Sequence, residues 1–131
     1  MQYIAGGVCA PKGFKAAGVH CGIRRNRSKY DLALIVSDEM ASAAAVYTQN
    51  LVKGAPILVT QKHLENGYAR AVIVNSGNAN TCNANGIEIA EGMCALVREY
   101  TGIREEDVAV ASTGVIGQPP SPQPISDGML R

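Results

Sequence analysis

Apolar residues occur along the chain in short runs that glycine, proline, asparagine and acidic residues interrupt. Runs rich in valine, isoleucine and alanine at residues 32–37, 69–74 and 108–112 predict buried strands, because their length and composition suit strands. Residues 14–23 contain interior glycines and predict a further extended segment. Residues 43–48 predict another strand, which we expect to form an antiparallel pair with residues 32–37 across a short acidic break.

The clearest helical pattern covers residues 87–101, where apolar side chains recur with the period of an α-helix and charged side chains fall opposite. Asn85 and Glu88 have the spacing of a capping box at its start. Gly102 is suited to the position just after its last turn. We therefore predict one amphipathic helix with defined ends.

A second helix is predicted over residues 57–65. Pro56 stands at its start, where proline is tolerated, and Asn66-Gly67 stands at its end. Its β-branched residues also suit a strand, which is the alternative. Farther along, residues 118–124 hold four prolines in seven positions, which predicts an extended connector.

Composition excludes several classes of partner. The chain has 131 residues with 12 lysines and arginines against 11 acidic residues, and this balance argues against nucleic acid or an anionic membrane as the main partner. No apolar run has the length of a membrane helix, and the first ten residues lack the apolar region of a signal peptide. We therefore expect a cytoplasmic protein.

The four cysteines lack the C-x₂-C spacing of zinc sites, and only two histidines are present to assist them. We expect no metal and reduced cysteines, as is usual in the cytosol. A serine-hydrolase elbow is absent, and the spacing of cysteines and histidines does not require a Cys-His pair. No nucleophile with its own base is therefore evident in this chain.

Two polar segments are candidates for a binding function. Residues 75–85 are rich in asparagine and predict a self-bonded loop before the amphipathic helix, at the place where nucleotide-binding folds hold phosphate. They lack the glycine motifs of those folds, and the pattern does not show which side chain contacts a substrate. Arg24, Arg25, Arg27 and Lys29 predict a solvated hairpin loop, which a phosphate-rich substrate such as coenzyme A could use.

The strand predicted at 108–112 runs into Thr113-Gly114, where a turn is expected. Glycine there would leave the amides of Thr113 and Gly114 uncovered. Two uncovered amides at a strand end can hold the negative charge that develops during acyl transfer. A plain strand-to-loop turn is the alternative interpretation.

Four segments, in this order, resemble the ornithine acetyltransferase family, the bifunctional glutamate N-acetyltransferase/amino-acid acetyltransferases of arginine biosynthesis. They read GGVCAPKGFKAAGVHCGIR, SDEMASAAAVYTQN, VIVNSGNANTC and VASTGVIG. The resemblance implies an α/β fold of layered sheets flanked by helices, similar to the N-terminal-nucleophile hydrolase sandwich, with this chain as the N-terminal half. Residues 1–117 would form the α/β domain, and residues 118–131 a connector and the start of a further segment.

In this family a precursor cleaves itself before a threonine, which becomes the N-terminal nucleophile of a β-chain. The motif that carries this threonine does not occur in these residues, so this α-chain alone would lack the nucleophile. The enzyme would move acetyl from N-acetylornithine to glutamate by a ping-pong cycle, without a cofactor, and acetyl-coenzyme A is a possible further substrate. The motif match assigns the oxyanion hole to Thr113 and Gly114. An α2β2 heterotetramer is expected.

Two other functions remain open from the residues alone. One is a self-processing aminopeptidase of similar architecture. The other is a non-catalytic module that binds a small anion at the asparagine-rich loop.

Overall fold

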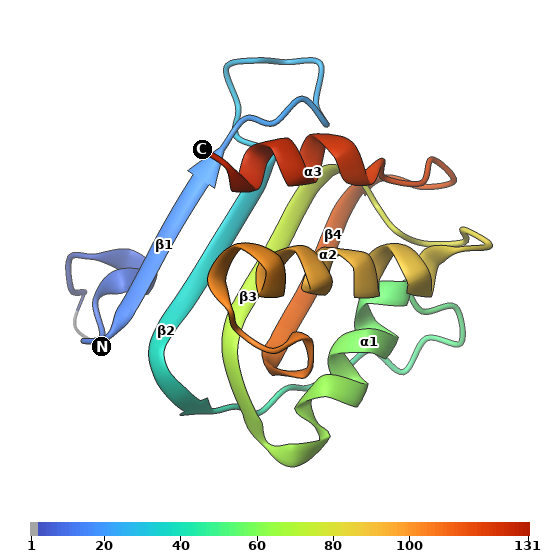
Figure 1. Ribbon diagram of the computed structural model, residues 1–131. Coiled ribbons are helices and arrows are strands. Elements are labelled where there is room, and N and C mark those ends of the chain that lie inside the picture. The colour runs from blue at the N-terminus through green and yellow to red at the C-terminus, as the bar shows by residue number, and fades with distance from the viewer. Residues whose placement is uncertain (1–2) are drawn as a thin grey trace.

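The computed structural model describes residues 3–131, and a single four-stranded sheet organises them in the order β1-β2-β3-β4 (Figure 1). Its strands are β1 (Phe14–Val19), β2 (Leu32–Ser42), β3 (Tyr68–Asn78) and β4 (Val108–Val115). β2 pairs antiparallel with both β1 and β3, whereas β3 and β4 are parallel. The mixed sheet with its helices confirms the predicted α/β class.

The helices lie on one face of the sheet (Figure 1). They are α1 (Ala55–His63), α2 (Gly86–Thr101) and α3 (Pro122–Met129), with short 3₁₀ turns at Gly7–Cys9, Leu64–Asn66 and Glu105–Asp107. α2 is part of the crossover that parallel pairing of β3 with β4 requires. No helix in residues 3–131 is long and apolar enough to cross a membrane.

Both predicted helices are confirmed, and so are the glycines that end them. Gly102 closes α2 with a φ of 74°, and Gly67 ends the turn after α1 with a φ of 77°. Glycine adopts this left-handed conformation readily, which makes it the usual residue just after a helix. The predicted capping box is wrong, because the side chain of Asn85 makes no capping hydrogen bond.

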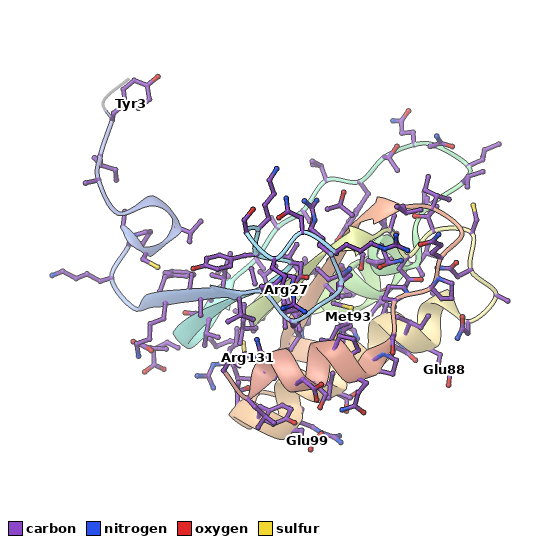
Figure 2. The ribbon with its side chains drawn as sticks, turned by 90° about the horizontal axis from the view of Figure 1, so that it is seen from above. Tyr3, Arg27, Glu88, Met93, Glu99 and Arg131 are labelled. Carbon is purple, nitrogen blue, oxygen red and sulfur yellow. The ribbon has the colours of Figure 1, made fainter. Side chains whose placement is uncertain are left out.

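The core lies between the sheet and α2. Met93 projects from α2 toward the sheet and is 2% exposed, whereas Glu88 and Glu99 project away from it (Figure 2). Ile73 from the sheet is fully buried against this layer. The buried apolar residues that share this core are Leu32, Val59, Ala71, Ala90, Cys94, Val97, Ile103, Val108, Val110 and Ile125.

Two strand predictions are wrong, one in where the strand ends and the other in whether a strand forms. The acidic pair Asp38-Glu39 does not break the chain, because β2 continues through it to Ser42, with a register shift against β3 between Val36 and Ala41. Asp38 is exposed there and forms an ion pair with Lys15 of β1, so its charge is compatible with a strand. Residues 43–48 form no strand.

The predicted connector at 118–124 is also wrong from Pro122 onward, where α3 begins. Pro122 occupies the first turn of α3. An N–H in the first turn has no partner within the helix, so the N–H that proline lacks costs no hydrogen bond. Ile125 is fully buried in the core. A Cβ on Gly128 would lie 2.7 Å from both the Cβ of Cys21 and the Cδ2 of Leu32, so α3 packs closely on the end of the sheet.

We predict that Ile125→Ala destabilises the protein, because it leaves a cavity between α3 and the sheet. The expected loss is about 2–5 kcal/mol in the free energy of unfolding, measured by thermal or urea denaturation. Leu130→Ala, at a side chain that is 73% exposed on the same segment, is the matched control and should change stability little. Equal effects of the two changes would contradict the packing of α3.

Candidate active site

Two glycines face each other across the parallel strands. Gly77 of β3 pairs in register with Gly114 of β4, and their φ angles are 131° and 129°. L-residues with a side chain rarely adopt this conformation. A Cβ placed on Gly114 would overlap the carbonyl group of Gly77. Both positions therefore require glycine, and the backbone is left uncovered by side chains where the two strands meet.

A cleft of about 590 Å³ opens beside this pair. Gly77, Asn78, Gly114 and Val115 line it from the sheet, and residues 23–26 line it from the loop between β1 and β2. The loop lies so close to the sheet that a Cβ on Gly77 would be 2.7 Å from the Cγ2 of Ile23. Gly114 therefore lies at a surface that a small substrate can reach.

The hydrogen bonds of β4 show which way its backbone groups point. The N–H of Val110 donates to Thr60 Oγ1 of α1, and that hydroxyl donates to the carbonyl of Val110, both at 2.9 Å. Val115 directs its carbonyl the other way, toward Ala79, whose N–H donates to it at 2.8 Å. Alternate residues of a strand point to opposite edges. The amide of Gly114 therefore points to the open edge, and that of Thr113 toward β3.

This geometry corrects one expectation about Thr113-Gly114. The predicted turn is absent, because β4 continues through both residues to Val115 and pairs Thr113 with Ser76. Thr113 is exposed, so its hydroxyl is accessible even though its amide faces the neighbouring strand. Within the described residues 3–131, the structure thus leaves the Gly114 amide and the Thr113 hydroxyl without a hydrogen-bond partner.

α1 covers the rest of the free edge of β4. His63 Nδ1 lies 2.8 Å from the carbonyl oxygen of Val108, and Thr60 pairs with Val110 as described. Side chains that occupy a strand edge prevent it from pairing with another chain. The edge is therefore closed near Val108 and Val110, and Gly114 lies beyond these contacts.

A buried carboxylate fixes the loop that forms the other wall. Asp31 is 2% exposed and accepts hydrogen bonds from the amides of Cys21 at 2.7 Å, Gly22 at 3.2 Å and Arg24 at 2.8 Å. His20 Nδ1 lies 3.1 Å from the same carboxylate. Burial acts to raise the pKa of Asp31, but the amides of Arg24 and Cys21 outweigh it and hold the pKa below its usual value.

The same loop is tied to the sheet by an arginine. Arg24 Nη2 donates to Ser76 Oγ at 2.7 Å, in the strand position before Gly77. The prediction of a hairpin loop is confirmed, since residues 20–31 join the antiparallel strands β1 and β2. The loop is not merely solvated, because Asp31 and Arg24 hold it against β3.

The asparagine-rich segment divides between strand and loop. Asn75 is fully buried within β3, and its Nδ2 donates to the carbonyl of Asn78 at 3.0 Å. Asn80 is 1% exposed and donates to the carbonyl of Gly86 at 2.6 Å, while Asn83 donates to Asn80 at 3.1 Å. The self-bonded loop is therefore confirmed beyond residue 78, whereas residues 75–78 form strand.

Sequence reasoning missed Asp31, and it placed Gly77 and Asn78 in a candidate binding segment without giving either residue a role. Gly77 had a usable signal, because an isolated glycine that follows a strand pattern often marks a bulge or a close backbone approach. Asp31 had none, since an aspartate between a polar loop and an apolar strand is also a common surface residue. Its role depends on the path of a loop that local pattern does not specify.

Cys21, which is half-buried, and Cys94, which is buried, are poor nucleophiles. Burial, with the neighbouring Asp31, raises the pKa of Cys21 to about 11. Burial raises the pKa of Cys94 to about 12. Thiolate is the reactive form, so both thiols are inert near neutral pH. Among residues 3–131, no cluster of three histidine, cysteine or acidic side chains is arranged to bind a metal.

Solved structures with the same architecture are proteins of arginine biosynthesis and acetyl transfer. The "arginine biosynthesis bifunctional protein argJ" of Bacillus halodurans superposes with a TM-score of 0.89 and 44% identity, covering 95% of this chain and 65% of that one. The ornithine acetyltransferase of Mycobacterium tuberculosis, solved with ornithine, superposes with a TM-score of 0.82 and 40% identity over 93% of this chain and 66% of that one.

A sequence profile of the ArgJ family matches residues 15–130, so the chain belongs to the ArgJ family. The arginine biosynthesis bifunctional protein ArgJ of Caldanaerobacter subterraneus subsp. tengcongensis is 49% identical over 120 residues, and that of Bacillus subtilis is 50% identical over 117 residues. These matches cover 91% and 88% of this chain. They cover 29% and 28% of the two relatives, so the chain spans less than a third of their length.

We predict that the cysteines react in two classes. Cys9 and Cys82 are exposed and should be modified quickly by a thiol reagent at pH 8, whereas Cys21 and Cys94 should react only after denaturation, because their raised pKa values leave little thiolate. Peptide mass mapping identifies the modified sites. Without reductant, all four should be free in the denatured protein, and finding two or fewer would contradict this.

We predict that Asp31→Asn lowers the free energy of unfolding by about 2 kcal/mol or more, because three amides lose a charged acceptor. The pKa of Asp31 is lowered in the folded state, so its contribution is full above the ordinary carboxyl pKa of about 4. It disappears as the pH falls through the lowered pKa. The difference in Tm between wild type and variant should shrink accordingly in acid, and Asp127→Asn, at an exposed carboxylate, should show no comparable loss.

Proposed function

We propose that this chain is the α-chain portion of an acetyltransferase that moves acetyl from N-acetylornithine to glutamate in arginine biosynthesis. Membership of the ArgJ family supports this reaction, together with the solved ornithine acetyltransferase that it resembles. The observation that carries the proposal is the uncovered backbone at Gly114, in a cleft beside the glycine pair.

The reaction would proceed in two acyl transfers through a threonine on the β-chain. The threonine hydroxyl attacks the acetyl carbonyl of N-acetylornithine, and its proton passes to the threonine's own α-amine. The C–N bond then breaks, and ornithine leaves with a proton. In the second transfer the amine of glutamate attacks the acetyl-threonine ester, so N-acetylglutamate forms and the threonine hydroxyl is restored.

The role of this chain is to stabilise the oxyanion of each tetrahedral intermediate. The amide of Gly114 points to the open edge of β4, where a substrate carbonyl can approach. The amide of Thr113 faces β3, so the free donor of Thr113 is its exposed hydroxyl. We therefore assign the oxyanion hole to the Gly114 amide and the Thr113 hydroxyl. Donors aimed at developing charge are among the largest contributors to such catalysis.

The β-chain would complete the site from the face of the sheet that the helices leave free (Figure 1). Ile35, Val72 and Val74 alternate with the core residues along their strands and are only partly buried. A partly exposed apolar sheet face is unfavourable in water and suits contact with a further layer. The cleaved precursor would supply that layer, in an α2β2 cytoplasmic enzyme.

We predict that Thr113→Val in the complete protein lowers kcat by about 10²-fold or more, as loss of an oxyanion donor does. Valine keeps the shape of threonine but removes its hydroxyl. Thr113→Ser, which keeps the hydroxyl, is the matched control and should retain most of the activity. The assay is acetyl transfer from N-acetylornithine to glutamate.

Gly114→Val should also abolish turnover, but for a reason that does not test the donor. Its side chain would collide with the carbonyl of Gly77 and disturb the pairing of β3 with β4. Comparison of the valine and serine variants at Thr113 avoids this problem. Equal activity of these two variants would overturn the assignment of the hydroxyl, and wild-type protein without acetyl transfer would overturn the proposed function.

A further inference from the structure

A positive charge lies on the face of the sheet that the helices leave free, here called the free face (Figure 1). Along β3, alternate residues that face the helices are buried. Alternation therefore places Arg70 on the free face together with Val72 and Val74. The register partners of Val72 on the neighbouring strands are Ile35 and Ala109, which are apolar as well. Arg70 is thus a cation at the end of an apolar surface.

The guanidinium of Arg70 is held in place but is not neutralised. Its Nη2 donates to the carbonyls of Asp38 at 2.8 Å and Ser37 at 3.4 Å, where β2 shifts its register against β3. Its Nε is buried and has no hydrogen-bond partner within residues 3–131, although the residue as a whole is only half-buried. Covering the free face would take this charge out of water, which is costly unless an anion pairs with it.

The acidic residues of the adjoining part of β2 do not supply that anion. The carboxylate of Asp38 is exposed and forms an ion pair with Lys15 of β1. Glu39 is exposed too. Among the described residues 3–131, no carboxylate lies within ion-pair distance of Arg70. The anion that suits Arg70 therefore has to come from whatever covers the free face.

A second copy of this sheet is poorly suited to be that cover. The paired segments of the four strands, which are residues 14–19, 32–36, 71–76 and 108–113, contain no acidic residue. Two such faces packed together would bring each Arg70 against apolar side chains and leave its charge unpaired. The composition of the face therefore favours a different layer that carries an acidic side chain.

Arg70 and the proposed oxyanion donor Thr113 lie at opposite ends of this face. Thr113 alternates with Ala109 and Ala111 along β4, so its side chain is on the free face as well. Ser76, the register partner of Thr113, lies six residues along β3 from Arg70, or about 20 Å at about 3.3 Å per residue. A charged pair at one end would fix the direction and register of a covering layer whose reacting group meets Thr113 at the other end.

We propose that Arg70 pairs with an acidic side chain of the β-chain layer and so fixes the position of that layer on the free face. This inference rests on the proposed function, which supplies the layer. The pair would be buried between the two layers, where loss of one member leaves the other charge without a partner. Arg70 is a positioning residue in this proposal, because it lies far from the reacting atoms.

The test uses the complete protein and follows the Tm between about pH 8 and about pH 5. Arg70→Met removes the charge and keeps an unbranched side chain, whereas Arg70→Lys keeps the charge. Lys15→Met is the matched control, because it breaks an exposed ion pair beside the same part of β2. Arg70→Met is also measured in an Asp38→Asn, Glu39→Gln background, so that neither neighbouring carboxylate can account for a pH effect.

We expect Arg70→Met to lower the Tm by about 5 °C or more near pH 8, because the partner carboxylate stays buried without its cation. Burial without a cation raises the pKa of that carboxylate above its ordinary value of about 4. It therefore becomes protonated as the pH falls, and the loss in Tm should shrink to about half or less near pH 5. Asp31 titrates in both proteins, so its effect cancels in the difference.

The pH dependence should persist in the background that lacks the Asp38 and Glu39 carboxylates. Arg70→Lys should retain most of the wild-type Tm. Lys15→Met should lower the Tm by about 1 °C or less at every pH, as is usual for an exposed pair. If Arg70→Met does not yield folded protein, Arg70→Gln, which keeps a donor for the carbonyls of β2, is measured in the same way.

Three results would overturn the proposal. A loss in Tm that is the same at every pH would mean that Arg70 acts only through the carbonyls of β2. A pH effect that disappears in the doubly substituted background would assign the titration to Asp38 or Glu39. Native mass spectrometry that shows weaker contact between two α-chains, with the α–β contact unchanged, would identify a second copy as the occupant. The proposed function fails separately, if wild type transfers no acetyl, since the Tm measurements need no activity.

Discussion

The contact between the backbones of Gly77 and Gly114 is the constraint on which the candidate site depends. Two strands of a parallel sheet normally carry side chains at every position, and those side chains would cover the backbone from above. Here both positions adopt a φ near 130°, and a single Cβ on Gly114 would meet the carbonyl of its neighbour. Glycine at both positions permits this close approach of the two backbones. The amide of Gly114 is accessible because it points to the open edge of β4.

The second wall of the cleft depends on electrostatics and not on sterics. A carboxylate buried without partners would be costly, but Asp31 is surrounded by amide donors that the loop supplies. The loop amides gain a hydrogen-bond acceptor, and the carboxylate of Asp31 gains donors that replace water. One acidic side chain therefore shapes a loop whose other charged side chains, Arg24, Arg25, Arg27 and Lys29, are basic.

Local sequence patterns identified the elements better than their ends. α2 followed from its helical period and its terminal glycine, because both signals are local. β3 and β4 were predicted too short, since Asn75, Ser76 and Thr113 favour loops when taken alone, and only their pairing across the sheet keeps them extended. α3 was missed for a similar reason. Its prolines suggested extended backbone, whereas burial of Ile125 stabilises a helix that begins at a proline.

Part of the site was visible in the sequence and part was not. Thr113 and Gly114 stood out through the motif and the small side chains after an apolar run. The direction of their amides could not be predicted, because it depends on which edge of β4 faces β3 and which faces Thr60 of α1. Asp31 and the arginines around it required knowledge of how a long loop returns to the sheet.

The parallel pairing of β3 with β4 also has a consequence for the order of folding. β1, β2 and β3 are joined as antiparallel neighbours, and the first two form a hairpin with contacts that are close in sequence. β4 reaches the sheet only after the whole of α2 has crossed it, and such distant pairings form late because more chain entropy is lost. The Gly114 cleft is therefore assembled by the last strand to join the sheet. In a chain growing on the ribosome, the loop of residues 20–31 would be in place before any oxyanion donor exists.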